Sequence, residues 1–373
     1  MNELQWAELV SEKIKTKLAV TAKRNTHKIP YTTKDGVFDD KSKDQICWWT
    51  NGFWGGMMWQ MYHATGDEVY LEIAKYDEKE LDRNLMNAQG MDHDSGFKWL
   101  PTAVCDYRIT GDQEARNRGL LAASDLAGRF NPAGSFIRAW NDSGDASKAG
   151  WAIIDCMMNL PLLYWAYEET KDPRFLQIAA AHADMAEKYF VCPDGSVNHI
   201  VAFNPVSGEF VRTYGGQGYA EGSSWTRGQA WALYGFVLSY IHTKNESYLN
   251  TAKRVANYFI ANMGSDALIP VDFRQPEDCR LEDSTASAIA ACGLIEIEKY
   301  VSQNEKHVYH QAAIKLLQVL DEKRCNWDAD CDNILEKCTA AFHDEEHEFS
   351  IIYGDYFFIE AIWKLTGQEI FIW

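Results

Sequence analysis

Residues 65–67 read Thr-Gly-Asp and separate two stretches in which apolar side chains recur at helical spacing. Similar short turns follow other apolar stretches, which makes six such turns along the chain. The other five are Thr110-Gly111-Asp112, Thr170-Lys171-Asp172, Thr243-Lys244-Asn245, the region of Asn304-Glu305-Lys306, and Thr366-Gly367-Gln368. After most of them come an aromatic residue and a second apolar stretch, as in residues 70–81, 175–189, 248–263 and 309–320. Each unit is therefore predicted to be a helical hairpin, and this repeat decides the fold.

The last hairpin needs a second helix from elsewhere in the chain, because few residues follow Thr366. The N-terminal segment, residues 1–20, spaces Leu4, Leu9 and Ile14 among charged residues, as an amphipathic helix does and a signal peptide does not. We expect this helix to pack against the sixth hairpin and close a ring of twelve helices. The predicted fold is an all-α (α/α)6 barrel of six helical hairpins, which forms a single catalytic domain over residues 1–373.

In such a barrel the short turns gather at one end and the long connections at the other. The long connections are rich in Gly, Asp, Asn, His and Trp. They are residues 23–48, 86–97, 131–150, 190–224, 264–283 and 324–351. Because loops on a rigid scaffold carry most binding and catalytic groups, we expect the functional site among these connections.

Composition and charge narrow the class of function. The 373-residue chain is 46% hydrophobic and 24% charged, and it contains no apolar run long enough to span a bilayer. Its net charge of -18 disfavours nucleic acid and anionic membranes as partners. The nine cysteines stand singly with no Cys-x-x-Cys pair, which favours reduced thiols in a cytoplasm. We expect a cytoplasmic enzyme that is a monomer or a homodimer.

A glycine-punctuated loop at residues 215–224 leads into a helix that carries Trp225, Arg227 and Trp231. Arg227 and Trp231 are four residues apart, so they share a face of that helix. A flat apolar ring beside a fixed cation suits a ligand with an apolar face and a carboxylate, such as a uronic acid. An ordinary core helix with a satisfied arginine is the alternative interpretation.

Asp155 interrupts a nearly wholly apolar segment, residues 151–163. We expect burial to raise the pKa of this carboxyl, which suits a group that donates and takes up protons near neutral pH. Asn159 lies one turn later and could hydrogen-bond the carboxylate or a sugar hydroxyl. The alternative is a structural Asp at a helix start. We expect Asp94 near Asp155, at the end of the barrel where the long connections gather. In glycosidases, two carboxylates that face one cleft divide the acid and base roles between them.

Two acidic segments have the spacing of metal-binding patterns. His343, Glu346 and His347 match the inverted zincin spacing, but they lie in a hydrophilic loop. Alternate aspartates from Asp328 to Asp332 match the start of a calcium loop, whose later glycine and glutamate positions are not matched. The cysteines lack ligand spacing. We therefore expect solvated acidic loops, with neither a metal nor a cofactor.

Six segments in a fixed order carry a resemblance to a known family. They are Trp49-Thr-Asn-Gly-Phe-Trp54, Asp92-His-Asp-Ser-Gly-Phe97, Ile153-Ile-Asp-Cys-Met-Met-Asn-Leu160, Gly222-Ser-Ser-Trp-Thr-Arg-Gly-Gln-Ala-Trp231, Asp283-Ser-Thr-Ala-Ser-Ala288 with Ala291-Cys-Gly293, and Gly354-Asp-Tyr356. Spread over nearly the whole chain, they resemble the unsaturated glucuronyl hydrolases, glycoside hydrolase family 88. The resemblance implies an (α/α)6 barrel.

The resemblance also implies the substrate and the reaction. The substrate is an oligosaccharide, made by a polysaccharide lyase, whose non-reducing end is a 4,5-unsaturated uronic acid. Such enzymes hydrate the sugar: an acid protonates carbon 4 of the enol ether, water adds at carbon 5, and the hemiketal opens to release the partner sugar.

Individual residues acquire roles through the same resemblance. Asp155 matches the acid/base residue of the family, and Asp94 matches its second essential carboxylate. The residues expected to pack on the sugars are Trp49, Trp140, Trp225 and Trp231. Those expected to bind the uronate and orient water are His93, His199, Gln217 and Arg227.

Two positions depart from the family pattern, because Asp92 stands where a second histidine is common and Tyr353 where a Trp is common. Members that accept sulfated chains tend to place Ser and Lys before the last helix, whereas residues 342–348 are strongly acidic here. We therefore expect an unsulfated substrate. An unsaturated rhamnogalacturonyl hydrolase and a sugar epimerase are alternatives of the same fold, and a non-catalytic sugar-binding protein is the non-enzyme alternative.

Overall fold

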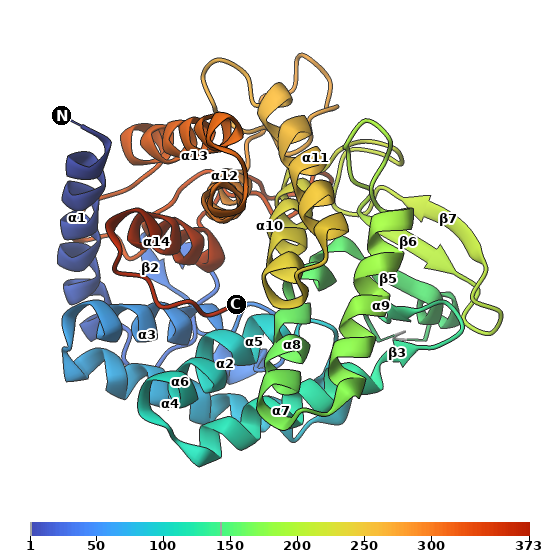
Figure 1. Cartoon of the computed structure of the whole chain (residues 1–373). Helices are drawn as coiled ribbons and strands as arrows, with labels where there is room; N and C mark the ends of the chain where they lie inside the picture. The colour runs from blue at the N-terminus through green and yellow to red at the C-terminus, as the bar shows by residue number, and fades with distance from the viewer. Residues whose placement is uncertain (1, 142–143) are drawn as a thin grey trace.

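The computed structural model describes residues 2–141 and 144–373, most of which lie in helices (Figure 1). The long helices are α1 Glu3–Arg24, α3 Phe53–Thr65, α4 Glu68–Leu85, α7 Gln113–Gly128, α8 Leu160–Thr170, α9 Pro173–Tyr189, α10 Thr226–Thr243, α11 Glu246–Asn262, α12 Ser284–Ile297, α13 Gln303–Lys323 and α14 Ile352–Thr366. Short turns join α3 to α4, α8 to α9, α10 to α11 and α12 to α13. Each of these pairs packs together as a helical hairpin.

The second hairpin differs in that its first helix is broken. This helix consists of α5 Ser95–Trp99, a π-helical turn Leu100–Val104 and α6 Cys105–Thr110, and α7 follows as its partner. Pro101 has no backbone N–H, and its ring crowds the preceding turn, so the regular α-helical hydrogen bonding cannot continue here. The hairpin repeat alone did not predict this break.

The inner helices contact one another in a closed order. The ring runs from α3 through the broken helix to α8, α10, α12 and α14, and then returns to α3. Every residue of α12 is buried, whereas the outer helices α4 and α11 bury only one face. The N-terminal helix α1 packs on α14 and supplies the outer helix of the sixth hairpin. The predicted (α/α)6 barrel, closed by the N-terminal helix, is therefore confirmed.

Three local hydrogen bonds hold the Thr-x-Asp turns. Thr65 donates its hydroxyl to the Met61 carbonyl (2.7 Å) and accepts the backbone N–H of Asp67 (3.2 Å). The Asp67 side chain accepts the N–H of Val69 (3.1 Å) as the N-cap of α4. Gly66 stands between them with φ of 70°, the left-handed conformation that ends a helix. The same hydrogen bonds recur at residues 110–112, 170–172 and 243–245.

The turn between α12 and α13 departs from the prediction. The sequence predicts it near Asn304, but residues 304–306 lie inside α13. Ser302 is the N-cap of α13, and its side chain and that of Glu305 form a capping box. The turn comes earlier than predicted because Ser302 satisfies the free N–H groups of this helix.

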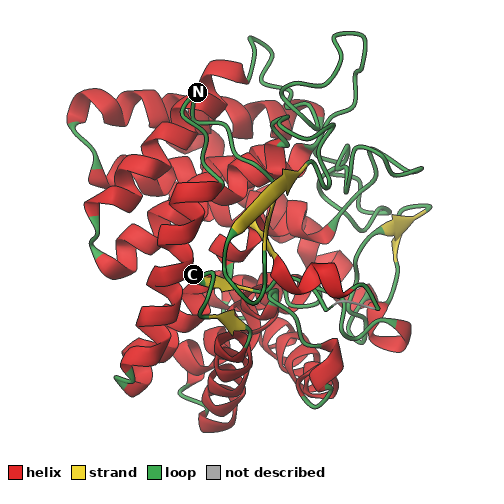
Figure 2. Ribbon diagram, turned by 90° about the vertical axis from the view of Figure 1, so that its right-hand side faces the viewer, coloured by secondary structure: helices red, strands yellow, loops and turns green. Residues whose placement is uncertain are grey.

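The long connections hold the strands and the short helical segments. A three-stranded antiparallel sheet has the order β5 Trp151–Ile153, β6 Ile200–Phe203 and β7 Phe210–Tyr214. The other segments are β1 Thr33–Lys34, β2 Val37–Phe38, α2 Lys41–Asp44, β3 Phe130–Asn131 and β4 Phe136–Ile137, with 3-10 turns at Ala88–Gly90, Ala146–Gly150, Ile154–Met158 and Glu298–Tyr300. Figure 2 shows the long loops gathered along one side of the helices, on its right. The sequence analysis did not predict the sheet.

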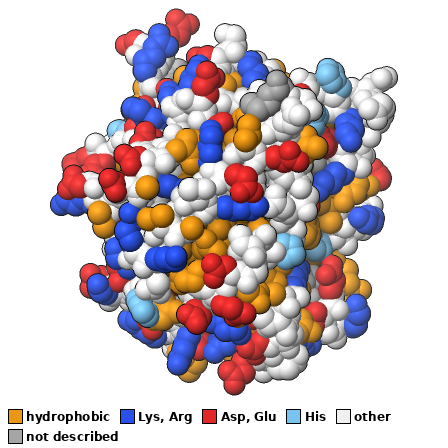
Figure 3. Space-filling model, turned by 90° about the vertical axis from the view of Figure 1, so that its left-hand side faces the viewer, with side chains coloured by type: hydrophobic (Ala, Val, Ile, Leu, Met, Phe, Trp, Pro, Cys, Tyr) orange, Lys and Arg blue, Asp and Glu red, His pale blue; other side chains and the backbone are white. Residues whose placement is uncertain are grey.

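Among the described residues, none of the helices combines the length and the apolar composition that spanning a bilayer needs. Acidic and basic side chains are interspersed over the face seen in Figure 3. The negative net charge is therefore not concentrated in one patch of that face.

Removal of one N-cap tests the account of the turns. We expect Asp67→Ala to lower the free energy of unfolding by about 1 kcal/mol, because the N–H of Val69 loses its acceptor. Urea denaturation measures the change. Glu72→Ala, an exposed substitution in the middle of the same helix, is the control. An effect of Asp67→Ala no larger than that of the control would contradict the role of the cap.

Candidate active site

Two carboxylates meet where the inner helices α5 and α8 begin. Asp94 directly precedes α5, and Asp155 lies in the 3-10 turn Ile154–Met158 before α8. Asn159 joins them, because its Nδ2 donates to Asp94 Oδ1 and to the Asp155 carbonyl, both at 3.3 Å. Its Oδ1 accepts the N–H of Phe97 (2.8 Å), which fixes the orientation of the amide. The Asp94 side chain and the Asp155 backbone thus belong to one hydrogen-bonded unit.

Close packing of α5 against α8 depends on Gly96. A Cβ at this position would lie 2.5 Å from Asn159 Cα and 2.7 Å from Asn159 Oδ1. Only glycine lets the two helix starts approach this closely. Gly96, two residues after Asp94 in the chain, therefore sets the position of the Asn159 amide that contacts Asp94.

The environment of Asp94 favours its neutral acid. Burial raises the pKa of Asp94 well above its ordinary value, and the nearby charges of Asp92 and Asp155 raise it further. Lys98 and the hydrogen bond from Asn159 act in the opposite direction. Asp92 also accepts the backbone N–H of Asp94 (3.0 Å), so this departure from the family pattern contacts the site directly.

The predicted rise in the pKa of Asp155 is wrong. Burial does raise this pKa, but the interaction with His199, together with the charge of Arg227, outweighs it and lowers the pKa below its ordinary value. His199 Nε2 lies 3.6 Å from Asp155 Oδ2. His199 Nδ1 accepts the N–H of Gln217 (2.9 Å), so Nε2 carries the hydrogen that faces Asp155. Asp155 is therefore the ionised member of the pair.

His93 is buried beside Asp94, with its Nε2 at 3.4 Å from Asp94 Oδ2. Burial lowers the pKa of His93 to about 4, so its ring is neutral near pH 7. Within the described residues, neither ring nitrogen has a hydrogen-bond partner. Buried polar atoms without partners are rare in folded proteins, and here they mark a place where a polar ligand can bind.

Arg227 is held by groups that the sequence analysis did not connect with it. Its guanidinium donates to Asp283 Oδ2 (2.6 Å), to the Thr339 carbonyl (2.6 Å) and to the Ala340 carbonyl. It lies 4.4 Å from the ring centroid of Trp225. Its Nε has no partner in the described part of the chain. Arg227 is thus a buried cation with most of its hydrogen bonds made, and its Nε–H remains available.

The predicted sugar-binding tryptophans fall into two groups. Trp49 and Trp231 share the neighbours Phe97 and Tyr353, with ring centroids 4.9–6.2 Å apart. Trp225 lies against His199, with centroids 4.4 Å apart. Trp140 is separate from these rings and packs beside the sheet β5-β6-β7. The structure therefore brings Trp49, Trp225 and Trp231 to the inner helices and leaves Trp140 on the sheet.

Gln217 connects the glycine loop to the last long connection. Its side-chain Nε2 donates to the Ala340 carbonyl (3.2 Å), and its backbone carbonyl accepts the N–H of Phe342 (2.9 Å). Gly216, with φ of 58°, precedes it, and a Cβ there would lie 2.0 Å from His199 Nδ1. Residues 339–342 bind both Gln217 and Arg227. Their role in the site was not predicted, because their sequence contains no motif that indicates it.

Asp283 and Asp355, at the starts of α12 and α14, hold neighbouring loops in place. Asp283 caps α12 and accepts from Arg227, as above, and from Thr285. Asp355 accepts the backbone N–H groups of Ile334 and Leu335, while burial raises the pKa of Asp355 to about 7. Both aspartates therefore position the connection that ends at α14.

The acidic metal-like motifs also engage neighbouring groups. His343 Nε2 lies 2.7 Å from the Tyr219 carbonyl, and His347 Nε2 lies 2.9 Å from the Phe342 carbonyl. Asp332 accepts from Arg24. In the part of the chain that the structure describes, no group of His, Cys, Asp or Glu is arranged to hold a metal ion.

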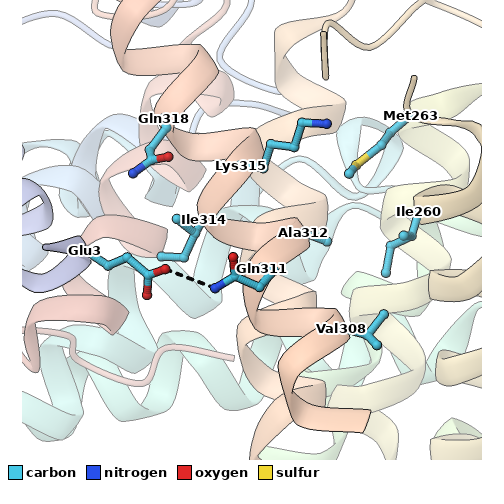
Figure 4. A pocket seen from close by; sticks show the side chains of 9 residues that line it. All are labelled: Glu3, Ile260, Met263, Val308, Gln311, Ala312, Ile314, Lys315 and Gln318. Carbon is cyan, nitrogen blue, oxygen red and sulfur yellow. Dashed lines mark hydrogen bonds between the residues drawn. The ribbon is translucent and has the colours of Figure 1, made fainter. Parts of the chain in front are cut away.

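A pocket on the outer surface lies apart from these residues. Figure 4 shows it between α11 and α13, lined by Ile260, Met263, Val308 and Lys315 among others. It contains none of the predicted site residues. Its lining is mostly apolar and carries no titratable pair comparable to Asp94 and Asp155, so it is a weaker candidate for chemistry.

The chain matches one family model and several characterised proteins. Residues 21–241 match Glycosyl Hydrolase Family 88. The unsaturated glucuronyl hydrolase of Bacillus sp. (strain GL1) is 36% identical over 333 residues, which covers 87% of this chain and 88% of that protein. The unsaturated chondroitin disaccharide hydrolase of Streptococcus pneumoniae is 34% identical over 341 residues, with 87% and 83% covered.

Solved structures share the fold over nearly the whole chain. The unsaturated glucuronyl hydrolase from Streptococcus agalactiae superposes with a TM-score of 0.92 at 29% identity, covering 100% of this chain and 94% of that one. A structure described as UGL_D88N/dGlcA-Glc-Rha-Glc gives a TM-score of 0.88 at 33% identity, covering 97% and 96%. The fold is therefore that of these hydrolases.

A methyl group at residue 96 tests the packing on which the carboxylate pair depends. We expect Gly96→Ala to lower the free energy of unfolding by about 1–3 kcal/mol, because Asn159 must move. Gly128→Ala is the matched control, since a Cβ there meets nothing within 4 Å. Chemical denaturation of both variants gives the comparison. Equal stability of Gly96→Ala and the wild type would contradict the close approach of α5 and α8.

Proposed function

This chain belongs to Glycosyl Hydrolase Family 88, and we propose that it acts as an unsaturated glucuronyl hydrolase. It releases 4,5-unsaturated glucuronic acid from the non-reducing end of oligosaccharides made by polysaccharide lyases. The observation that carries the proposal is the buried pair Asp94 and Asp155, whose surroundings move their pKa values in opposite directions. We further propose one catalytic domain over residues 1–373, in a cytoplasmic monomer or homodimer.

Asp155 serves as the acid and the base of a hydration. The carboxylate of the arriving uronate repels the Asp155 anion, which raises the pKa of Asp155 and lets it take a proton. Asp155 then gives this proton to carbon 4 of the enol ether. Water adds to carbon 5 and returns a proton to Asp155, so the residue is again protonated, as it was before the transfer to carbon 4, and it loses this proton to solvent when the products leave. The hemiketal that forms opens and releases the partner sugar.

Asp94 assists as a neutral group. A protonated Asp94 donates a hydrogen bond to the sugar and adds no negative charge beside the uronate. Asn159 fixes its position, as the hydrogen bond to Asp94 Oδ1 supports. This arrangement lets a protein with a net charge of -18 bind an anion, because the second carboxylate of the pair is kept uncharged.

The remaining site residues bind the substrate. His93, His199, Gln217 and Arg227 bind the uronate and orient water, while Trp49, Trp140, Trp225 and Trp231 pack on the sugars. Support comes from atoms without hydrogen-bond partners among the described residues: both ring nitrogens of His93, Nε2 of His199, Nε of Arg227 and Nε1 of Trp225. A sugar acid can supply the hydrogen-bond partners that these buried polar atoms lack.

Turnover of unsaturated disaccharides tests the proposal. The wild type should remove the ultraviolet absorbance of a lyase-generated glucuronyl disaccharide, and Asp155→Asn should lower kcat by about 10²- to 10⁴-fold, because an amide cannot transfer the proton. Asp321→Asn, a partly buried aspartate on the outer helix α13, is the control.

Three outcomes would contradict the proposal. If Asp155→Asn kept most of its activity, an epimerase-like site based on histidines would fit better than a carboxylate acid. If a pectin-derived unsaturated disaccharide were the better substrate, the chain would be an unsaturated rhamnogalacturonyl hydrolase. No loss of absorbance with either substrate would leave a sugar-binding protein.

The acidic loop before α14 favours unsulfated sugars. Asp344, Glu345 and Glu346 are exposed. The same loop is tied to the site through Gln217, whose carbonyl accepts the N–H of Phe342. A sulfate group on the leaving sugar would meet this negative charge. We therefore propose that the substrate is an unsulfated uronide.

Matched sulfated and unsulfated disaccharides test the preference. The wild type should have the higher kcat/KM for the unsulfated form, and Glu345→Lys should raise kcat/KM for the sulfated form by at most about fivefold, as expected for one exposed charge. Glu12→Lys, an exposed charge reversal on α1, is the control and should change neither value. A wild-type preference for the sulfated disaccharide would refute this part of the proposal.

A further inference from the structure

The sheet beside the catalytic pair carries an aromatic face that the reaction above leaves mostly unused. Ile153 on β5 pairs with Ile200 on β6, and Ile200 pairs with Tyr214 on β7. Directly opposed residues of antiparallel strands point to the same face, and Trp151 lies two residues from Ile153, so all four share one face. The opposite face, with Val201, packs into the main core.

Three half-buried rings make up the outer part of this face. The centroids of Trp151 and Tyr214 are 4.9 Å apart with an interplanar angle of 35°, and Trp140 lies 6.2 Å from Trp151. With Ala139, Ile153 and Ile200 they form a small apolar cluster separate from the main core. The rings are only partly covered by the protein, so they leave apolar surface open to a ligand.

The aromatic face runs directly into the catalytic residues. β5 ends at Ile153, two residues before Asp155, and β6 begins immediately after His199. The N–H of Ile154 donates to the His199 carbonyl (3.1 Å), which holds the two strand ends together. At about 3.3 Å per residue, Trp151 lies at most roughly 13 Å along the chain from Asp155. This reach is longer than one sugar ring, so the face is placed to contact sugars beyond the ring that reacts.

Two cations stand over the outer rings. Lys148 Nζ is 5.9 Å from the centroid of Trp151, and the Arg212 guanidinium is 4.7 Å from that of Tyr214. Arg212 also pairs with Glu221, and both of these side chains are exposed. In a protein with a net charge of -18, cations gathered on one aromatic face provide local attraction for an anionic ligand.

We propose that Trp140, Trp151 and Tyr214 form a second saccharide platform, which binds sugars beyond the leaving sugar, and that Lys148 and Arg212 favour a uronate among them. The inference rests on the proposed function and narrows its substrate to oligosaccharides longer than a disaccharide. Aromatic rings bind the apolar faces of sugars by stacking, and cations beside them pair with a carboxylate. In an alternating uronide the next carboxylate is on the third sugar, which is the part of the ligand that reaches the platform.

Three unsaturated substrates separate the role of the rings from the role of the cations. They are an unsulfated disaccharide, the tetrasaccharide of the same series with a uronate as its third sugar, and dGlcA-Glc-Rha-Glc, whose later sugars are neutral. The wild type should have a higher kcat/KM for the uronate tetrasaccharide than for the disaccharide. Trp151→Ala should lower kcat/KM on that tetrasaccharide about tenfold more than on the disaccharide, and Trp151→Phe should restore most of the loss. Arg212→Gln should lower kcat/KM for the uronate tetrasaccharide more than it lowers kcat/KM for dGlcA-Glc-Rha-Glc.

Phe210→Ala provides the control on the same sheet. Phe210 is exposed on β7 and stacks on Tyr189 outside the platform, so this variant should leave the ratio of the two kcat/KM values unchanged. Two results would refute the platform. One is that Trp151→Ala lowers kcat/KM equally on the uronate tetrasaccharide and the disaccharide, and the other is that the wild type has the higher kcat/KM for the disaccharide.

Calorimetric titration with the uronate tetrasaccharide separates the platform from the proposed function. Were the wild type to cleave no unsaturated sugar, the proposed function would fail, and the titration would still decide the platform. About tenfold weaker binding by Trp151→Ala would support the platform. Unchanged binding would refute it.

Discussion

Burial of two neighbouring carboxyl groups is the constraint on which the site depends. Asn159 contacts both the Asp94 side chain and the Asp155 backbone, and so helps to hold one in position relative to the other. Two nearby carboxyls removed from water cannot both ionise without a large cost, and their surroundings therefore divide the charge between them. His199 keeps Asp155 ionised, whereas burial leaves Asp94 with its proton.

The barrel matters because the members of this site come from distant parts of the chain. Asp94, Asp155 and His199 lie in three different long connections. The inner helices bring the ends of these connections to one place, and Gly96 allows the last close approach between α5 and α8. The same geometry accounts for anion binding by an acidic protein, since local donors and an uncharged Asp94 act where the substrate lies, whatever the net charge.

The hairpins could be predicted from the sequence because the bonds that end and restart each helix join neighbours such as Thr65 and Asp67. The lowered pKa of Asp155 could not be predicted, because the apolar sequence around this residue indicates burial but does not indicate its contact with His199. Arg227 was recognised as a fixed cation, but its partner Asp283 and the carbonyls of residues 339 and 340 come from remote loops. The sheet was missed because its strands are short and lie within connections that look irregular.

The central claim is that the two carboxylates differ in protonation before substrate binds. Neutron diffraction from a deuterated crystal of the unliganded protein near pH 7 tests it most directly, because hydrogen positions become visible. The account predicts a deuteron on the Asp94 carboxyl, none on Asp155, and a deuteron on His199 Nε2 directed at Asp155. A deuteron on Asp155 with none on Asp94 would contradict it.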